Sequence, residues 1–221
     1  MECRVLYLTG LFEKLDDQLF QRVSDFVQQQ GYVIHGMELY PGTSFGNRKF
    51  TTEVARVQQE INKYDPCLII AHSLGAYTCI QTTVKCPLVL LEPSFKIADI
   101  ILPSLKRNGE SYLYSDGTHH LSISQNFIQS VKNAPSIEKS AQNIRSNRVH
   151  IFGAGKAGYK IAEQYHAYLQ NSDYSLIPNA DHDFSAEEDL QKIFMTIKNS
   201  PALCRAVEDM FAQSSSDRKS S

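Results

Sequence analysis

The sequence predicts an α/β protein: a mainly parallel sheet of about six strands with helices on both faces and a helical cap. Short apolar, β-branched runs alternate with amphipathic helical patterns along most of the chain. This alternation is typical of parallel sheets that are covered on both faces. It is broken once, between Pro93 and Asn147, where two mostly helical patterns predict the cap.

Each expected strand is a short run of branched or aromatic residues, and each expected helix carries apolar residues at helical spacing on one face. The expected strands are Val5–Leu8, Tyr32–Leu39, Cys67–Ala71, Leu88–Leu91, Val149–Phe152 and Tyr174–Ile177. The expected helices are Lys14–Gln30, Phe50–Ile61, the segment after Ser73, Ile97–Leu105 and Ile123–Val131 in the cap, Ile161–Leu169, Leu190–Ile197 and Pro201–Phe211. We expect one domain over residues 1–212, a cap insertion at about 93–147, and a disordered polar tail at 213–221.

Composition excludes several classes of function. The formal charge of −2 and the scattered lysines and arginines argue against a nucleic-acid partner. No segment approaches the roughly 20 apolar residues of a membrane span, and no signal peptide is recognisable, so we expect a cytoplasmic protein. The five cysteines have no metal-ligand spacing, and Cys3, Cys67 and Cys79 lie in apolar segments, which predicts reduced, buried thiols. Nothing in the sequence indicates the oligomeric state.

The most informative segment is Ala71-His-Ser73-Leu-Gly75, which follows an apolar run directly and precedes a helical pattern. A serine between a buried strand and a helix sits on a tight turn that raises its hydroxyl clear of the backbone. Small residues two before and two after it let the strand and helix pass closely, and Ala71 and Gly75 meet that need. The alternative is an ordinary turn in which serine caps a helix.

This turn resembles the nucleophile elbow of the α/β-hydrolase fold, and the order of strands with a cap after the fourth is similar to that fold along nearly the whole chain. The resemblance implies Ser73 as nucleophile and two backbone N–H donors for an oxyanion. One donor would be Leu74, and the other Leu11, in the loop Leu8-Thr-Gly10-Leu-Phe12 after the first strand. A plain strand-ending turn remains the alternative for that loop.

The resemblance also calls for a histidine after the last strand, and His182 occupies that place. His72 flanks the nucleophile, where it could shape the site without acting as a base. His119 and His120 lie in the cap, within reach of a ligand there. We expect the remaining histidines to be surface or interface residues.

The third member of a triad, the acid, has no obvious residue. The loop after Val149–Phe152, where the fold most often has its aspartate, reads Gly153-Ala-Gly155-Lys-Ala-Gly158. This pattern also resembles a dinucleotide-binding turn, but too little chain follows it for such a domain. Some members of the fold draw their acid from the end of the fourth strand, so the resemblance implies Glu92, which stands there at the same edge of the sheet, as the candidate acid. The alternatives are a structural Glu92 and a Ser73–His182 dyad with no acid.

We therefore predict a serine hydrolase that cleaves a carboxylic ester or thioester through an acyl-enzyme, with no metal or organic cofactor and a small acyl-type substrate. Apolar cap residues, including Phe127 and Ile128, could line an acyl pocket, although such residues more often pack a cap onto its core. The alternative is a catalytically weak or inactive protein of the same fold that binds a ligand or partner. A nucleotide-dependent protein is the third hypothesis.

Overall fold

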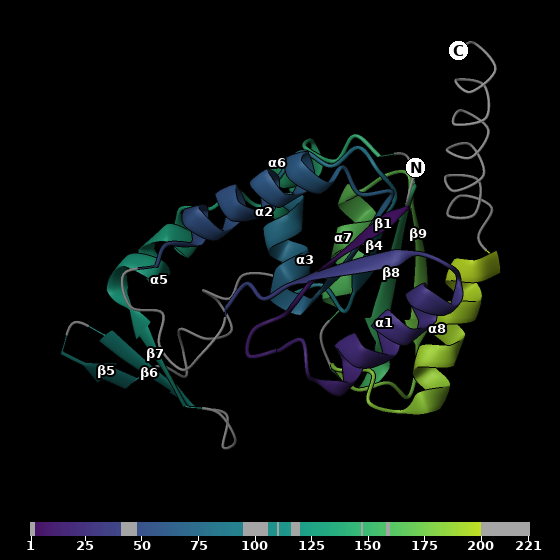
Figure 1. The fold of residues 1–221 in the computed structure, drawn as a ribbon. Coiled ribbons are helices and arrows are strands. Elements are labelled where there is room, and N and C mark those ends of the chain that lie inside the picture. Colours follow the sequence, from purple (N-terminus) through teal and green to yellow (C-terminus); the bar gives the residue numbers. More distant parts are fainter. Residues whose placement is uncertain are drawn as a thin grey trace, which may run out of the picture.

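A central sheet of six parallel strands organises the molecule (Figure 1), in the order β2-β1-β3-β4-β8-β9. The computed structural model describes residues 3–40, 48–94, 106–109, 111–115, 120–146, 148–157 and 160–199. The strands are β1 (Arg4–Leu8), β2 (Val33–Met37), β3 (Leu68–His72), β4 (Leu88–Leu91), β8 (Val149–Ala154) and β9 (Ser172–Ile177). This arrangement confirms the predicted fold class.

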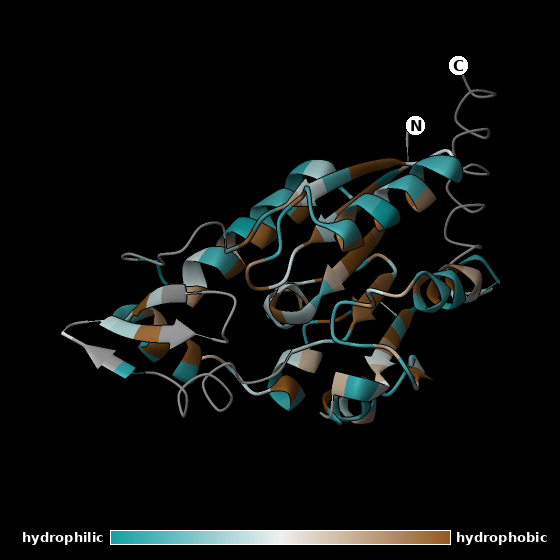
Figure 2. Cartoon of the chain, turned by 90° about the horizontal axis from the view of Figure 1, so that it is seen from below, coloured by the Kyte–Doolittle hydropathy of each residue, from teal (hydrophilic) through white to brown (hydrophobic). Residues whose placement is uncertain are grey.

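Helices cover both faces of the sheet (Figure 1). On one face, α1 (Gln18–Gln29) and α8 (Glu187–Asn199) pack over one hydrophobic cluster. On the other, α2 (Phe50–Tyr64), α3 (Ser73–Ile80) and α7 (Ile161–Tyr168) pack over a second. Figure 2 shows apolar strands between helices whose outward faces are hydrophilic. Because the strands are covered on both faces, their sequences are nearly continuous apolar runs.

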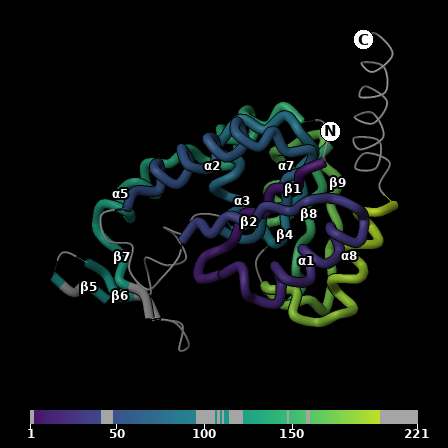
Figure 3. Tube along the Cα trace, viewed as in Figure 1, coloured from purple at the N-terminus to yellow at the C-terminus, as the bar shows by residue number. Residues whose placement is uncertain are grey.

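The path of the chain explains where a site can form. β1 lies between β2 and β3, so the connections after β1 and β3 leave the sheet toward opposite faces, as the trace in Figure 3 allows the reader to follow. In open parallel sheets, ligands bind outside the carboxyl ends of the strands at such a point. The loops after β1, β3 and β9 should therefore meet at one edge.

The cap differs from the prediction. Besides helices, it contains a small antiparallel sheet formed by β5 (Lys106–Asn108), β6 (Ser111–Ser115) and β7 (His120–Ser124), and β7 includes the first two residues of the helix expected at Ile123–Val131. It is followed by α5 (Gln125–Lys132) and the short α6 (Ile137–Ala141). The expected helix at Ile97–Leu105 lies outside the described residues, as do the helix at Pro201–Phe211 and the tail.

α5 joins the cap to the body of the protein. It packs beside α2, and its residues Phe127 and Ile128 are buried in the same hydrophobic cluster as α2 and α3. Ser124 caps this helix by accepting a hydrogen bond from the Phe127 N–H. These two apolar residues therefore pack the cap onto the core, which was the alternative to their lining an acyl pocket.

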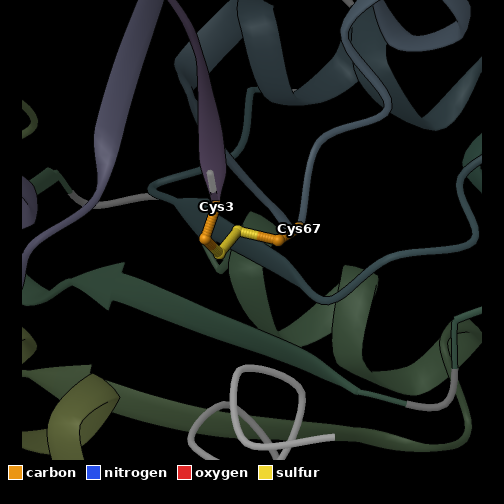
Figure 4. Close-up of a disulfide and its surroundings, with 2 residues drawn as sticks. All are labelled: Cys3 and Cys67. Atoms are coloured by element: carbon orange, nitrogen blue, oxygen red, sulfur yellow. A yellow bond between two sulfur atoms is a disulfide. The ribbon is translucent and has the colours of Figure 1, made fainter. Parts of the chain in front are cut away.

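The cysteine prediction is wrong for one pair. Cys3, just before β1, and Cys67, just before β3, form a disulfide with a Cα–Cα distance of 5.8 Å (Figure 4). Adjacent parallel strands bring the two side chains together, whereas their separation in sequence gives no hint of it. Cys79 and Cys86 are free thiols. Disulfides persist mainly in oxidising compartments, so the cysteines no longer support a reducing one. Within the described ranges, no helix is long and apolar enough to cross a membrane.

Candidate active site

Ser73 occupies the turn between β3 and α3 with a backbone φ of 49°. Positive φ is unusual for a residue with a side chain and is a mark of a functional turn. Gly75 allows the turn to form, because a Cβ there would lie 2.4 Å from the carbonyl oxygen of Thr9 and 2.6 Å from that of Leu8. The local sequence therefore gives the geometry expected of a nucleophile elbow.

His182 lies in the loop between β9 and α8, and its Nε2 is 2.9 Å from the Ser73 Oγ. These residues are 109 positions apart in sequence, and the parallel sheet brings them to the same edge. Burial, and then the charge of His72, lower the pKa of His182 to about 4. A neutral imidazole at pH 7 is the form that accepts the proton of a serine hydroxyl.

The loop after β1 adjoins the serine. A Cβ on Gly10 would lie 3.0 Å from the Ser73 Cβ and 3.2 Å from the His72 Nδ1, so only a glycine fits there without movement. The next residue, Leu11, forms an isolated parallel bridge with Tyr40. In the part of the chain that the structure describes, no backbone acceptor is bonded to the Leu11 N–H.

Leu74 is in the first turn of α3, where backbone N–H groups have no acceptor within the helix. The two predicted oxyanion donors thus lie in the loop after β1 and in the first turn of α3, and in the described part of the chain neither N–H group is taken up by a backbone hydrogen bond of the helix or the strands. Their sequence positions agree with the oxyanion hole that the resemblance implied, and this role remains a prediction.

Glu92 does not have the position expected of the triad acid. Its carboxylate accepts a hydrogen bond from the Ala154 N–H, and neither a hydrogen bond nor an ion pair links it to His182 in the described ranges. Burial raises the pKa of Glu92 to about 7, although the Ala154 N–H acts in the opposite direction. Glu92 therefore joins the ends of β4 and β8 and does not orient the imidazole.

Among the residues that the structure describes, no other carboxylate takes its place. Asp181 accepts a hydrogen bond from the Ser185 N–H, and the Oδ1 of Asp183 is 4.0 Å from the His72 Nε2. Among the described residues, the Nδ1 of His182 has no hydrogen-bond partner. The side chains brought together at this edge are therefore those of a dyad, Ser73 and His182.

The glycine-rich loop has a packing role. β8 extends to Ala154, and a Cβ on Gly155 would lie 2.3 Å from the carbonyl oxygen of Pro178, in the loop that carries His182. The Lys156 N–H, which a phosphate would need, donates to the Ala180 oxygen at 2.9 Å. The need for two loops to approach closely thus accounts for the glycine at 155 without a nucleotide.

Sequence reasoning missed one charged residue of the site. Glu13, in the loop after β1, is almost fully buried, and its Oε2 is 2.8 Å from the His72 Nδ1. It also accepts hydrogen bonds from Tyr7 and from the Gly10 N–H. A carboxylate three residues after the glycine of the oxyanion loop was the only signal in the sequence.

One group of potential metal ligands lies at the site, formed by His72, His182 and Asp183. Both ring nitrogens of His72 already make hydrogen bonds, to Glu13 and to the backbone oxygen of His182. The Nε2 of His182 is bonded to Ser73. His72 would have to give up one of its two partners to bind an ion, so the group does not fit a resident metal. Of the two cap histidines, His120 begins β7 and His119 lies outside the described residues.

No family model and no curated protein matches the sequence, but solved structures do. The chain is similar to Est1E from Butyrivibrio proteoclasticus, with a TM-score of 0.72 and 12% identity over 95% of this chain and 89% of that one. It is similar to the esterase domain of a Rhodothermus marinus protein, with a TM-score of 0.61 and 18% identity over 88% and 84% of the two chains. For mouse alpha/beta hydrolase domain-containing protein 10, the TM-score is 0.64 at 12% identity, over 89% and 88%. The chain has the α/β-hydrolase fold.

Proposed function

We propose that this protein is a serine hydrolase that cleaves a carboxylic ester or thioester through an acyl-enzyme. One observation carries the proposal: the Nε2 of His182 lies 2.9 Å from the Oγ of a serine held at positive φ. A hydrogen bond of this length between nucleophile and base is the arrangement that activates a serine hydroxyl. The solved structures similar to this chain include esterases, which agrees with this choice of reaction.

The chemistry follows from these groups. The Ser73 Oγ attacks the acyl carbon as its proton passes to the His182 Nε2, and a tetrahedral oxyanion forms. The N–H groups of Leu11 and Leu74 stabilise this charge. His182 then donates its proton to the leaving oxygen or sulfur, and water, activated by the same imidazole, releases the acid and restores Ser73. The leaving group carries away the proton of Ser73 and the attacking water supplies its replacement, so the cycle restores the dyad and needs no cofactor.

The low pKa of His182 has two consequences for this mechanism. The imidazole is neutral and available as a base over a wide range of pH. It is also a weak base, and without a carboxylate its protonated form is less stabilised than in a full triad. In trypsin, replacing the triad aspartate by an amide lowers kcat by about 10⁴, an example from another fold. We therefore expect slow turnover with activated esters.

The test is labelling with a fluorophosphonate probe, followed by a burst assay with p-nitrophenyl butyrate. We expect the wild type to label, Ser73→Ala to lose labelling completely, and His182→Gln to label roughly 10³-fold more slowly. Ser24→Ala is the matched control, since Ser24 and Ser73 are both 8% exposed and Ser24 lies on α1, in the opposite layer. A folded wild type that neither labels nor gives a burst would refute the proposal.

A second candidate is a catalytically weak or inactive binding protein. The unpartnered Nδ1 of His182 favours it, because an imidazole without an orienting acceptor is a poorer base. The same experiment separates the two, since an inactive binding protein would not label at Ser73 and a catalytically weak one would label without a measurable burst. Comparing p-nitrophenyl acetate, butyrate and octanoate with acetyl-coenzyme A then distinguishes an esterase from a thioesterase.

A further inference from the structure

A buried polar cluster adjoins the dyad, and we name it the Glu13 cluster after its central residue. It consists of Tyr7, Gly10, Glu13 and His72. The Tyr7 hydroxyl donates to the Glu13 Oε1 at 2.5 Å, and the Gly10 N–H donates to the Oε2 at 2.6 Å. The His72 Nδ1 is 2.8 Å from the same Oε2. Two donors besides the histidine thus stabilise a negative carboxylate out of contact with water.

The other nitrogen of His72 reaches the catalytic histidine. Its Nε2 is 3.0 Å from the backbone oxygen of His182. A carbonyl oxygen can only accept a hydrogen bond, and so can an ionised carboxylate. His72 must therefore carry a proton on both nitrogens to bond to both partners, which makes it an imidazolium paired with Glu13.

The electrostatics agree with this geometry. Burial acts to lower the pKa of His72, but the Glu13 charge and hydrogen bond outweigh it, and the net shift is upward. Burial acts to raise the pKa of Glu13, but the His72 charge and the hydrogen bonds give a net shift downward. Both shifts favour the charged forms, as expected for a buried pair with its remaining polar atoms bonded.

The cluster ties together the three loops that form the catalytic edge. Glu13 follows β1 in the loop that contains Leu11, His72 ends β3 immediately before the nucleophile, and His182 lies in the loop after β9. The ring centroids of His72 and His182 are 5.1 Å apart. The His182 loop is further fixed where the Lys156 N–H donates to Ala180.

We propose that the buried His72–Glu13 ion pair is a positioning device for the catalytic base: by holding His182 through its main-chain oxygen, it takes over the orienting role of a triad carboxylate, which none of the described residues supplies. This inference rests on the proposed function of the Ser73–His182 dyad. Neither residue of the pair touches the reacting atoms. The pair sets the position of the imidazole, and the positive charge of His72 discourages a second proton on His182.

Other charged groups near the two histidines act on the same balance. His182 faces His72, Glu13 and Asp181, and the His72 charge lowers its pKa while the two carboxylates raise it. His72 also faces Asp183, and its charge acts on Glu92 as well. Among these groups, His72 has the largest electrostatic effect on His182. Removing the imidazolium should therefore raise the pKa of His182.

The sharpest variant is Glu13→Gln, which keeps the shape of the side chain and removes its charge. A neutral His72 has a single ring N–H and cannot donate to both residue 13 and His182. We expect kcat to fall roughly 10- to 100-fold with little change in KM, the range set by loss of a charge-assisted bond. The acid limb of the pH profile should move to higher pH. His72→Asn should act in the same direction, provided that it folds.

The matched control is His150→Asn. His150 is also a buried histidine, but its Nε2 bonds to Ser175 on β9 and it makes no hydrogen bond to the dyad. A merely structural role for His72 predicts that all three variants lose stability and leave the acid limb in place. Movement of the limb in Glu13→Gln and in a folded His72→Asn, with no movement in His150→Asn, supports positioning.

A ¹⁵N NMR titration of the histidine rings needs no substrate and separates this inference from the proposed function. We expect His72 in the wild type to be doubly protonated at pH 7, and the pKa of His182 to rise in Glu13→Gln. A neutral His72, or an unchanged His182 titration in the folded variant, would overturn the inference even if Ser73 labels. A doubly protonated His72 in a protein that does not label would instead refute the hydrolase and leave the ion pair intact.

Discussion

The disulfide between Cys3 and Cys67 makes a quantitative prediction about stability. The bond joins the starts of β1 and β3, and its two cysteines are 64 residues apart in the sequence. In the chain-entropy model, cross-linking a loop of this length removes enough disorder from the unfolded chain to stabilise the fold by about 4 kcal/mol at 25 °C. Domains unfold with roughly 5–15 kcal/mol in total. The variant Cys3→Ala/Cys67→Ala should therefore lose a large part of its free energy of unfolding.

Urea unfolding followed by far-UV circular dichroism measures this loss, and the absence of tryptophan makes that probe preferable to fluorescence. Cys86→Ala, which removes a free thiol, is the control and should unfold near the wild type. A thiol count of the unfolded, unreduced protein should give three, five cysteines less the two in the bond. A count of five, or a wild-type midpoint indifferent to reductant, would refute the reasoning.

Four further predictions concern the site. Gly75→Ala should destabilise the fold by about 1–3 kcal/mol, measured by urea unfolding, because the new methyl meets backbone oxygens. Gly155→Ala should slow labelling of the serine, because its methyl would push against the loop that carries His182. Glu92→Gln should label at close to the wild-type rate. In the wild type, the Glu92 pKa is about 7 in the fold and about 4.5 in the unfolded chain, so the free energy of unfolding should fall as the pH rises from 4.5 to 7. This fall should be absent in Glu92→Gln. Finally, kcat/KM of the wild type should stay level down to about pH 5, since the His182 pKa is about 4; an acid limb near pH 6.5 would contradict this.

The parallel sheet could be predicted because its signal is local and repeated. Each buried strand is a short apolar run, and the sheet orders them by rules of connection that need no further information. The elbow was predictable for the same reason: Ser73 and Gly75 lie within three residues of each other, and the steric demand acts between close neighbours. His182 followed from its place after the last strand.

The cap was harder because its signals were mixed. The run Ser111–Ser115 reads Ser-Tyr-Leu-Tyr-Ser, with tyrosine at every second position as in a strand, and Asp116-Gly117 is a hairpin turn signal. The flanking segments have helical spacing, and this spacing predicts a helical cap without the small sheet. The disulfide failed for a different reason: strand order, which the cysteine spacing does not encode, makes β1 and β3 neighbours.

The acid of the site could not be found by searching for a carboxylate at a triad position, because in the described structure none lies there. The contact that holds His182 is made to its main-chain oxygen, and every residue has such an oxygen, so no sequence pattern identifies it. Glu13 was visible only as an acidic residue in a loop, and His72 only as the neighbour of the nucleophile. What distinguishes Glu13 and His72 is that they are buried in contact with each other. The Glu13 carboxylate has three donors and the His72 imidazole lies between two acceptors, so Glu13 is ionised and His72 is doubly protonated. In this state His72 holds the catalytic histidine at its main-chain oxygen, and not at its Nδ1.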